Sequence, residues 1–285
     1  MKLRDILKRI EFIWHIIAIS VQVGAFILLW RNQVRVEYDP SEGDLVLRSL
    51  LFIVYGISLF YLIFNIPKLL RIITKTPLLW ILIFWAILSF LWSSNPQITI
   101  RRSISVLFAT LYSVVLFIRY SFHDVVKILF YALLIILIGS YFVVLFYPEW
   151  GIMQSIHRGN WRGIMNHKND FGTICLLLII TEIYFFKNAN NKSIILLSVL
   201  ITATAYALFK SDSATAIISF VIVLIALPLI EFGRRTKREW PIYIFLLISF
   251  ITTIFFVIVN NNEFFFNLIG RSSTFTGRVP LWNYC

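Results

Sequence analysis

Charged side chains are scarce in this sequence, because Asp, Glu, Lys and Arg together account for only 14% of its 285 residues. A soluble domain carries roughly 25% charged residues, so the composition excludes an ordinary water-soluble globule. Hydrophobic residues instead reach 59%, and they fall in blocks long enough to cross about 30 Å of hydrocarbon as helices. The sequence therefore predicts an all-α protein, a polytopic transmembrane helical bundle.

Cysteines and carboxylates are also too few or too scattered to build a metal site. The two cysteines, Cys175 and Cys285, provide neither a disulfide framework nor metal-ligand spacing. Cys175 lies inside an apolar block, where we expect a small packing residue. The acidic stretch EYDPSEGD lacks the ligand spacing of a calcium loop, and no cluster of the Asp-x-Asp type is present. We therefore expect no metal and no cofactor.

Nine apolar segments are predicted to cross the membrane, each as a helix, because only hydrogen bonds within the segment satisfy the backbone in lipid. They are Phe12–Trp30, Leu45–Ile66, Leu78–Trp92, Ile104–Ile118, Val125–Tyr147, Phe171–Phe186, Ile194–Phe209, Ala214–Ile230 and Ile242–Val259. No small-x-small cleavage site follows Trp30, so we interpret the first segment as a retained span rather than a signal peptide.

The 26 basic residues outnumber the 14 acidic ones, which gives a net charge of +12. Nucleic-acid binding would need a basic, aromatic-interleaved soluble region, and the sequence contains none, so we exclude nucleic acid as a partner. Cytoplasmic loops of membrane proteins retain positive charge. A cytoplasmic N-terminus places more than half of the basic residues inside, including the RRTKR cluster at 234–238. We therefore predict nine spans with the N-terminus in the cytoplasm.

Positive charge also gathers in four short segments of the predicted outer side, where topology does not require it. The segments are WSSNPQITIRRSI with Arg101 and Arg102, HRGNWRGIMNHKNDFG with Arg158, Arg162, His167 and Lys168, FKSDSAT with Lys210, and GRSSTFTGRVPLW with Arg278. Any single arginine there could simply reach lipid phosphates at the interface. The second segment is harder to explain in that way as a whole.

That second segment has the chemistry of an anion site. Three glycines, Gly159, Gly163 and Gly172, allow backbone or ligand to approach closely. Asn169 or Asp170 is expected to cap the sixth spanning helix, whose N-terminus then faces outward with its partial positive charge. Arginine and lysine around a helix N-terminus bind phosphate groups. The segment therefore predicts a site for an anionic head group.

The four segments together resemble the O-antigen ligase and polymerase family, which includes exopolysaccharide polymerase-like members. WSSNPQITIRRSI, RGIMNHKNDFG, FKSDSATAII and TGRVPLW occur in that family's usual order, each at a membrane boundary. The resemblance implies three regions: residues 1–88 with the first three helices, residues 89–259 as the family-like transmembrane core with helices 4–9, and residues 260–285 as the start of a large periplasmic loop.

The resemblance also implies a function in the bacterial inner membrane, among membrane lipids. Family members transfer a glycan from undecaprenyl diphosphate, without metal, to lipid A–core or to a growing polysaccharide at the periplasmic face. By this analogy the diphosphate or nearby glycan would be bound by Arg101, Arg102, Arg158, Arg162, Lys168 and Lys210. Arg278 would be the essential catalytic residue, and His167 would orient substrate or serve a structural role.

Two departures from the family pattern shape this interpretation. Many ligases have an arginine just after the serine-rich turn, where this chain has Ser213-Ala214-Thr215, and its absence favours a polymerase or exopolysaccharide-type member. The family also continues beyond the TGR motif into a loop that holds a proposed catalytic histidine, whereas this sequence stops at Cys285. We therefore expect a truncated member that is inactive alone.

Two other classes remain open at this stage. A polysaccharide or lipid-linked oligosaccharide transporter, or flippase, would use the same substrate but usually places ionisable residues near the bilayer centre. The predicted span centres here contain almost no charge, and Glu182 lies toward the inner end of its helix. A non-enzymatic envelope membrane protein would need only the helix packing.

Overall fold

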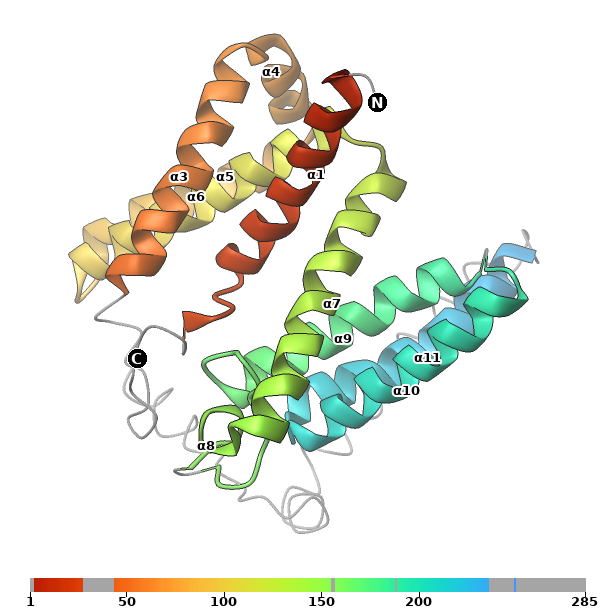
Figure 1. Cartoon of the computed structure of the whole chain (residues 1–285). Helices are drawn as coiled ribbons and strands as arrows, with labels where there is room; N and C mark the ends of the chain where they lie inside the picture. The colour runs from red at the N-terminus through yellow and green to blue at the C-terminus, as the bar shows by residue number, and fades with distance from the viewer. Residues whose placement is uncertain (1–2, 28–43, 155–156, 188, 236–248, 250–285) are drawn as a thin grey trace. The chain divides into compact units, whose positions relative to one another are not determined.

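The computed structural model describes residues 3–27, 44–154, 157–187, 189–235 and 249. Regular structure within these ranges is entirely helical, apart from one isolated antiparallel bridge between Ile152 and Trp161. The helices, drawn in Figure 1, are α1 Leu3–Gln22, α3 Leu45–Ile63, α4 Ile66–Lys75, α5 Pro77–Leu88, the 3-10 helix η1 Ser89–Trp92, α6 Pro96–Arg119, α7 Phe122–Phe146, α8 Pro148–Gly151, α9 Lys168–Phe186, α10 Asn191–Lys210 and α11 Ala214–Arg235. The all-α prediction is confirmed for this part of the chain.

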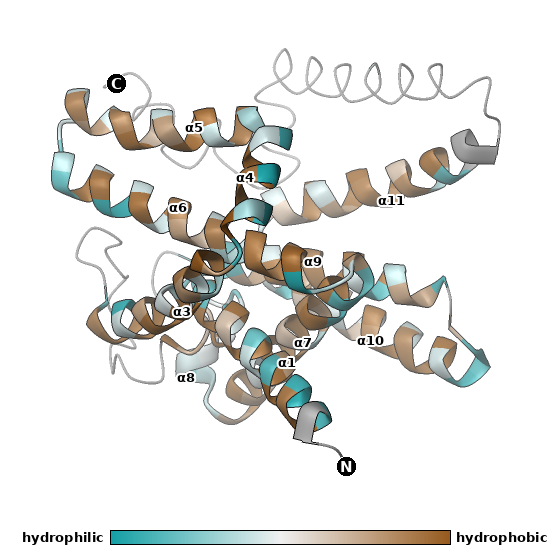
Figure 2. Ribbon diagram, turned by 90° about the horizontal axis from the view of Figure 1, so that it is seen from above, coloured by the Kyte–Doolittle hydropathy of each residue, from teal (hydrophilic) through white to brown (hydrophobic). Residues whose placement is uncertain are grey.

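Six of the described helices are long and apolar enough to cross a membrane: α3, α6, α7, α9, α10 and α11. Figure 2 shows hydrophobic residues along most of the helical surface. Large apolar side chains are widely exposed, for example Phe52 at 74% and Leu78 at 75%, as expected where lipid rather than water surrounds a helix. A multi-pass helical membrane protein is therefore supported. The ninth predicted span, Ile242–Val259, lies outside the described residues except for Ser249.

Helix α1 does not follow the predicted span Phe12–Trp30. It begins nine residues earlier and ends at Gln22, and Gly24, with a φ of +73°, lets the backbone leave the helix. The amide of Phe26 then donates to the carbonyl of Ile164, at 3.2 Å. The prediction of one continuous helix through this stretch is wrong, because the glycine allows the chain to turn toward the loop that precedes α9.

The third predicted span, Leu78–Trp92, is joined to a helix that the sequence analysis treated as an inner loop. Helix α4 precedes it, and the chain bends by 94° between α4 and the α5–η1 pair. Pro77 opens α5 and disfavours helical geometry at Thr76, which adopts φ −127° and ψ 52°. The basic residues of α4 share one face of that helix at a spacing of three to four: Lys68, Arg71 and Lys75.

The second predicted span and the fourth to eighth each correspond to a single helix whose bounds differ from the predicted ones. Helix α6 begins at Pro96, because a proline fits the first helical turn. Arg101 and Arg102 therefore lie inside that helix and not at its entrance. Helix α9 likewise begins at Lys168, three residues before the predicted start. The polar first turns were omitted from the predicted spans because hydropathy marks only the apolar part of a helix.

Helix α7 is central to the packing, since it contacts α1, α8 and α9. Ile128, Ala132 and Ile136 of α7 are completely buried. Ile128 and Ala132 belong to a core cluster that also contains Ala18 and Ile19 of α1. A small residue at position 132 lets the two helices approach closely, because side-chain size sets the distance between helix axes.

Polar contacts also join α1 to α6. His15 Nδ1 lies 3.1 Å from the Tyr112 hydroxyl, and both residues are buried. Arg119 donates to both carboxylate oxygens of Glu11 at 2.7 and 2.9 Å. This bidentate pair is partly exposed to the surroundings, so it contributes orientation more than stability. The Glu11–Arg119 contact lies at the end of α6, directly before α7 begins, so it fixes α1 near the start of α7.

We predict that Ala132→Leu destabilises the protein by about 1–3 kcal/mol, because the added side chain overpacks the α1–α7 interface. Thermal unfolding in detergent should show a lower midpoint than wild type. Ile138→Leu provides the matched control on the same helix, since Ile138 is 59% exposed and should leave the midpoint nearly unchanged. Equal midpoints for Ala132→Leu and wild type would contradict this packing.

Candidate functional site

The candidate site is built around residues 152–167, which connect α8 to α9 and are called the α8–α9 loop here. Backbone hydrogen bonds fix the conformation of the described part of this loop. The Met153 amide donates to the Asn160 carbonyl at 2.9 Å, and the Gly159 amide donates back to Met153 at 3.1 Å. The Trp161 amide donates to the carbonyl of Lys210 at the end of α10, also at 2.9 Å. The loop is therefore a folded element tied to α10.

Two glycines fix this loop against α7. The amides of Arg162 and Gly163 both donate to the Gly151 carbonyl, at 2.9 and 3.0 Å. Gly163 has a φ of +59°, and a β-carbon there would collide with the side chain of Ser140 on α7. Ser140 in turn accepts a hydrogen bond from the Ile164 amide. Position 163 therefore requires glycine for both backbone conformation and space.

Arg162 is the most unusual charge in the loop. It is only 6% exposed, and its Nε donates to the Trp150 carbonyl at 2.8 Å. Its Nη2 is buried and has no hydrogen-bond partner within the described structure. Burial lowers the pKa of this guanidinium. A buried cation with an unsatisfied donor is costly unless an acceptor, preferably anionic, completes its hydrogen bonds.

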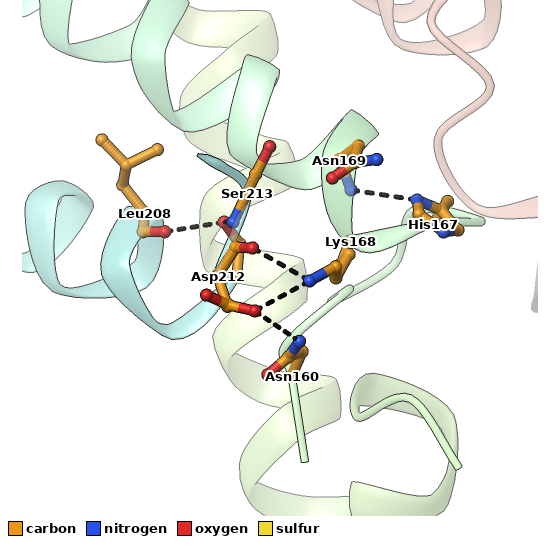
Figure 3. A network of polar contacts seen from close by, with 8 residues as sticks. Asn160, His167, Lys168, Asn169, Leu208, Asp212 and Ser213 are labelled. Atoms are coloured by element: carbon orange, nitrogen blue, oxygen red, sulfur yellow. Dashed lines mark hydrogen bonds and ion pairs between the residues drawn. The ribbon is translucent and has the colours of Figure 1, made fainter. Parts of the chain in front are cut away.

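Lys168 is also buried, but it already has a partner. Its Nζ donates to both the carbonyl and the carboxylate Oδ2 of Asp212, each at 2.9 Å, and Lys168 is 2% exposed. Asn160 donates to the same Oδ2 at 3.1 Å. Figure 3 shows the three side chains converging from the loop, the start of α9 and the turn after α10. We call this arrangement the Lys168–Asp212 clamp.

His167 caps α9, which corrects the prediction that Asn169 or Asp170 does so. Its Nδ1 accepts a hydrogen bond from the Asn169 amide at 3.1 Å. Any side chain with an acceptor two or three residues before a free helical amide can do this, and sequence alone favoured the commoner Asn and Asp. The His167 ring also meets the His157 ring edge to face, with centroids 5.6 Å apart.

Exposed cations surround this buried framework. Arg158 is exposed on the loop. Lys210 is exposed at the end of α10, with its Nζ 5.6 Å from the centre of the Tyr206 ring. The sequence-predicted cations therefore occupy two different positions: Arg162 and Lys168 are built into the interior, whereas Arg158 and Lys210 remain accessible to a ligand.

The start of α9 packs closely on the turn between α10 and α11. A β-carbon added to Gly172 would lie 2.6 Å from the β-carbon of Ser213 and 2.9 Å from Ser211 Oγ. Ser213 is 1% exposed, and its Oγ has no hydrogen-bond partner within the described ranges. Ser211 Oγ donates to the Leu208 carbonyl instead. The turn at residues 211–213 therefore packs closely against the first turns of α9.

Arg101 and Arg102 are not part of this cluster. Arg101 and Arg102 lie on α6, which packs mainly against α3, α5 and η1. Arg278 lies outside the described residues. No group of three or more His, Cys, Asp or Glu side chains that could hold a metal ion is found in the part of the chain that the structure describes. The roles assigned to these three arginines remain predictions.

Several residues of the site were missed by the sequence analysis. Asp212 stands in the FKSDSAT segment but received no predicted role, although it is the partner of Lys168. Asn160 and Ser140 were not singled out at all. The one available signal was the Ser-Asp-Ser turn, a composition that favours local turns. Pairing Asp212 with Lys168, 44 residues away, needs the packing of α9 against α10.

Comparison with known proteins adds no relative: no protein-family model matches the chain, and neither a curated protein nor a solved structure is significantly similar to it.

We predict that Asp212→Ala lowers the free energy of unfolding by about 1–3 kcal/mol, because it leaves the buried Lys168 ammonium without its charged acceptor. Chemical or thermal unfolding in detergent would measure the loss. Glu149→Ala is the control, since it removes an exposed carboxylate of α8 and should change stability by less than about 0.5 kcal/mol. Equal effects of the two substitutions would show that the clamp is not stabilising.

Proposed function

We propose that this chain is a bacterial inner-membrane protein related to O-antigen ligases and polymerases. It would have about nine spans and a cytoplasmic N-terminus. Its proposed activity is the transfer of a glycan from undecaprenyl diphosphate to lipid A–core or to a growing polysaccharide at the periplasmic face. The order of the four cationic motifs in the sequence supports the family. The geometry of the α8–α9 loop supports an anionic substrate.

The observation that carries the proposal is the buried Arg162 guanidinium with its unpartnered Nη2. A membrane protein gains nothing from burying a cation unless an anion or another acceptor meets it. Arginine matches the oxygens of a phosphate through its fork of donors. Arg158 and Lys210 are exposed on the same loop and the adjoining helix end. Together they suit a diphosphate better than a neutral sugar.

A groove beside the loop suits the hydrocarbon part of such a substrate. It has a volume of about 530 Å³ and is lined by residues of α7 and α10: Tyr141, Ser198, Val199, Thr202, Ala203 and Tyr206. The Tyr206 ring also packs edge to face with Trp161 of the α8–α9 loop, and Lys210 lies over its face. A polyprenyl chain in the groove would therefore place its head group near Lys210.

In the proposed transfer, an acceptor hydroxyl oxygen attacks the anomeric carbon of the lipid-linked glycan. The bond from that carbon to the diphosphate oxygen breaks, a base takes the hydroxyl proton, and the diphosphate leaves with the bonding electrons. Protein cations stabilise the leaving anion in place of a metal. We assign this role to Arg158, Arg162 and Lys210, with Arg101 and Arg102 toward the glycan and Arg278 as the essential residue.

Direct binding tests the anion site. The purified protein in detergent should bind undecaprenyl diphosphate more tightly than undecaprenol, which has the same chain without the charge. Arg162→Gln should weaken diphosphate binding by about tenfold or more, because one charge-assisted hydrogen bond contributes about 1.5–3 kcal/mol. Arg71→Gln on α4 is the charge-matched control and should bind as wild type does. Equal affinity for both lipids would refute the head-group site.

Reconstitution separates transfer from transport. Glycan transferred or lengthened by this chain in proteoliposomes with a lipid-linked oligosaccharide and an acceptor, without added metal, would support the proposed activity and refute the expectation that the chain is inactive alone. Movement of the intact lipid-linked unit across the bilayer, with no change in glycan length, would instead support a flippase. Binding with neither reaction is the result expected of a family member that is inactive alone, and it would support the head-group site without transfer by this chain.

The proposed orientation has its own test. In a chain whose two cysteines are replaced by serine, Arg158→Cys should react with a membrane-impermeant maleimide added to intact spheroplasts. Lys68→Cys on α4 should react only after the membrane is permeabilised, because the proposed topology places it on the cytoplasmic side. Both positions are exposed in the structure, so access is set by the membrane. The reverse labelling pattern would invert the topology.

A further inference from the structure

Glu182 is a carboxyl group completely enclosed between two membrane-spanning-capable helices, and the proposed function makes no use of it. It lies on α9 and is 0% exposed. Helix α10 packs along α9 as its neighbour, and Figure 1 shows the two running side by side. The Glu182 side chain faces Thr204 of α10, which is also fully buried. An acidic group at such a position is rare in hydrocarbon and needs a physical explanation.

Its two carboxyl oxygens have very different surroundings. Oε1 lies 2.8 Å from the Thr204 hydroxyl. Oε2 is buried and has no hydrogen-bond partner among the described residues. The ion pairs Arg119–Glu11 and Lys168–Asp212 do not involve Glu182, and its one hydrogen-bond partner among the described residues is Thr204. An ionised Glu182 would thus be a buried charge with one hydrogen bond and no counter-ion.

The hydroxyl of Thr204 also lies 2.9 Å from the carbonyl oxygen of Leu200, one turn earlier on α10. A hydroxyl has one proton to donate and two lone pairs to accept. A carbonyl can only accept, so the Thr204 proton completes the Leu200 contact. The contact with Glu182 then needs a hydrogen that comes from the carboxyl side. A proton on Oε1 satisfies both contacts at once and removes the unpaired charge.

We propose that Glu182 holds a proton at neutral pH and is a neutral carboxylic acid inside the α9–α10 interface. The ligand of this site is the proton itself. Glu182 donates to Thr204 across the interface between the two helices, and Thr204 donates to the Leu200 carbonyl within α10. The inference is independent of the proposed glycan transfer, because it rests on contacts of α9 and α10 that are separate from the α8–α9 loop.

Infrared spectroscopy tests the protonation state directly. Protein reconstituted in lipid at neutral pH should show the carbonyl stretch of a protonated carboxylic acid that disappears in the difference spectrum with Glu182→Gln. The control Glu149→Gln removes an exposed carboxylate, and its difference spectrum should lose carboxylate bands instead. Loss of carboxylate bands on Glu182→Gln, as in the control, would overturn the proposal.

A second variant leaves the carboxyl in place. Thr204→Val removes the hydroxyl at nearly constant volume, so the protonated-carboxyl band should persist but move to the frequency of a more weakly hydrogen-bonded acid. A band at the wild-type position in Thr204→Val would show that the carboxyl does not donate to Thr204 and would refute the hydrogen-bonded pair. This measurement remains decisive if Glu182→Gln fails to fold.

Discussion

An unpaired polar group cannot be hydrated inside hydrocarbon, and this constraint explains most of the described structure. Backbone amides and carbonyls are satisfied within helices, and where the chain leaves a helix other groups replace those bonds. The α8–α9 loop shows how this is done: Gly151 accepts two amides, Ser140 accepts a third, and the Lys210 carbonyl accepts a fourth. Non-helical backbone beside membrane-spanning-capable helices is tolerated because it is bonded to protein.

Charged groups are treated in three different ways under the same constraint. The Lys168 ammonium is neutralised by Asp212, while the Glu182 carboxyl is satisfied by a proton in our proposal. The Arg162 guanidinium has neither kind of compensation, because its Nη2 has no hydrogen-bond partner among the described residues. The first arrangement is complete, and in the second only Oε2 of an uncharged acid lacks a partner among the described residues. The third leaves a donor of a charged group unsatisfied, and this difference is the basis of the proposal that Arg162 meets an anionic ligand.

Composition and hydropathy were sufficient to predict the helical class and the approximate positions of eight helices, because apolar length is set by the bilayer itself. They were insufficient at the polar ends. The amphipathic α4 was taken for a loop because its basic face lowers its hydropathy, and His167 was not expected to cap α9 because Asn and Asp cap more often. The Lys168–Asp212 contact depends on how α9 meets the turn after α10. No local sequence pattern indicates that contact, although the cationic motif drew attention to the loop.

The Lys168–Asp212 clamp also has a mechanical consequence. Lys168 begins α9, Asp212 lies in the turn after α10, and Asn160 belongs to the α8–α9 loop, so one carboxylate joins three separate segments. Shifting α9 or the turn would separate the buried Lys168 ammonium from its half-exposed carboxylate partner, and shifting the loop would break the Asn160 hydrogen bond. Small displacements should therefore be shared by all three segments rather than absorbed by one. The backbone positions of Arg158 and Lys210 belong to two of these segments, so the carboxylate of Asp212 couples the placement of one cation to that of the other.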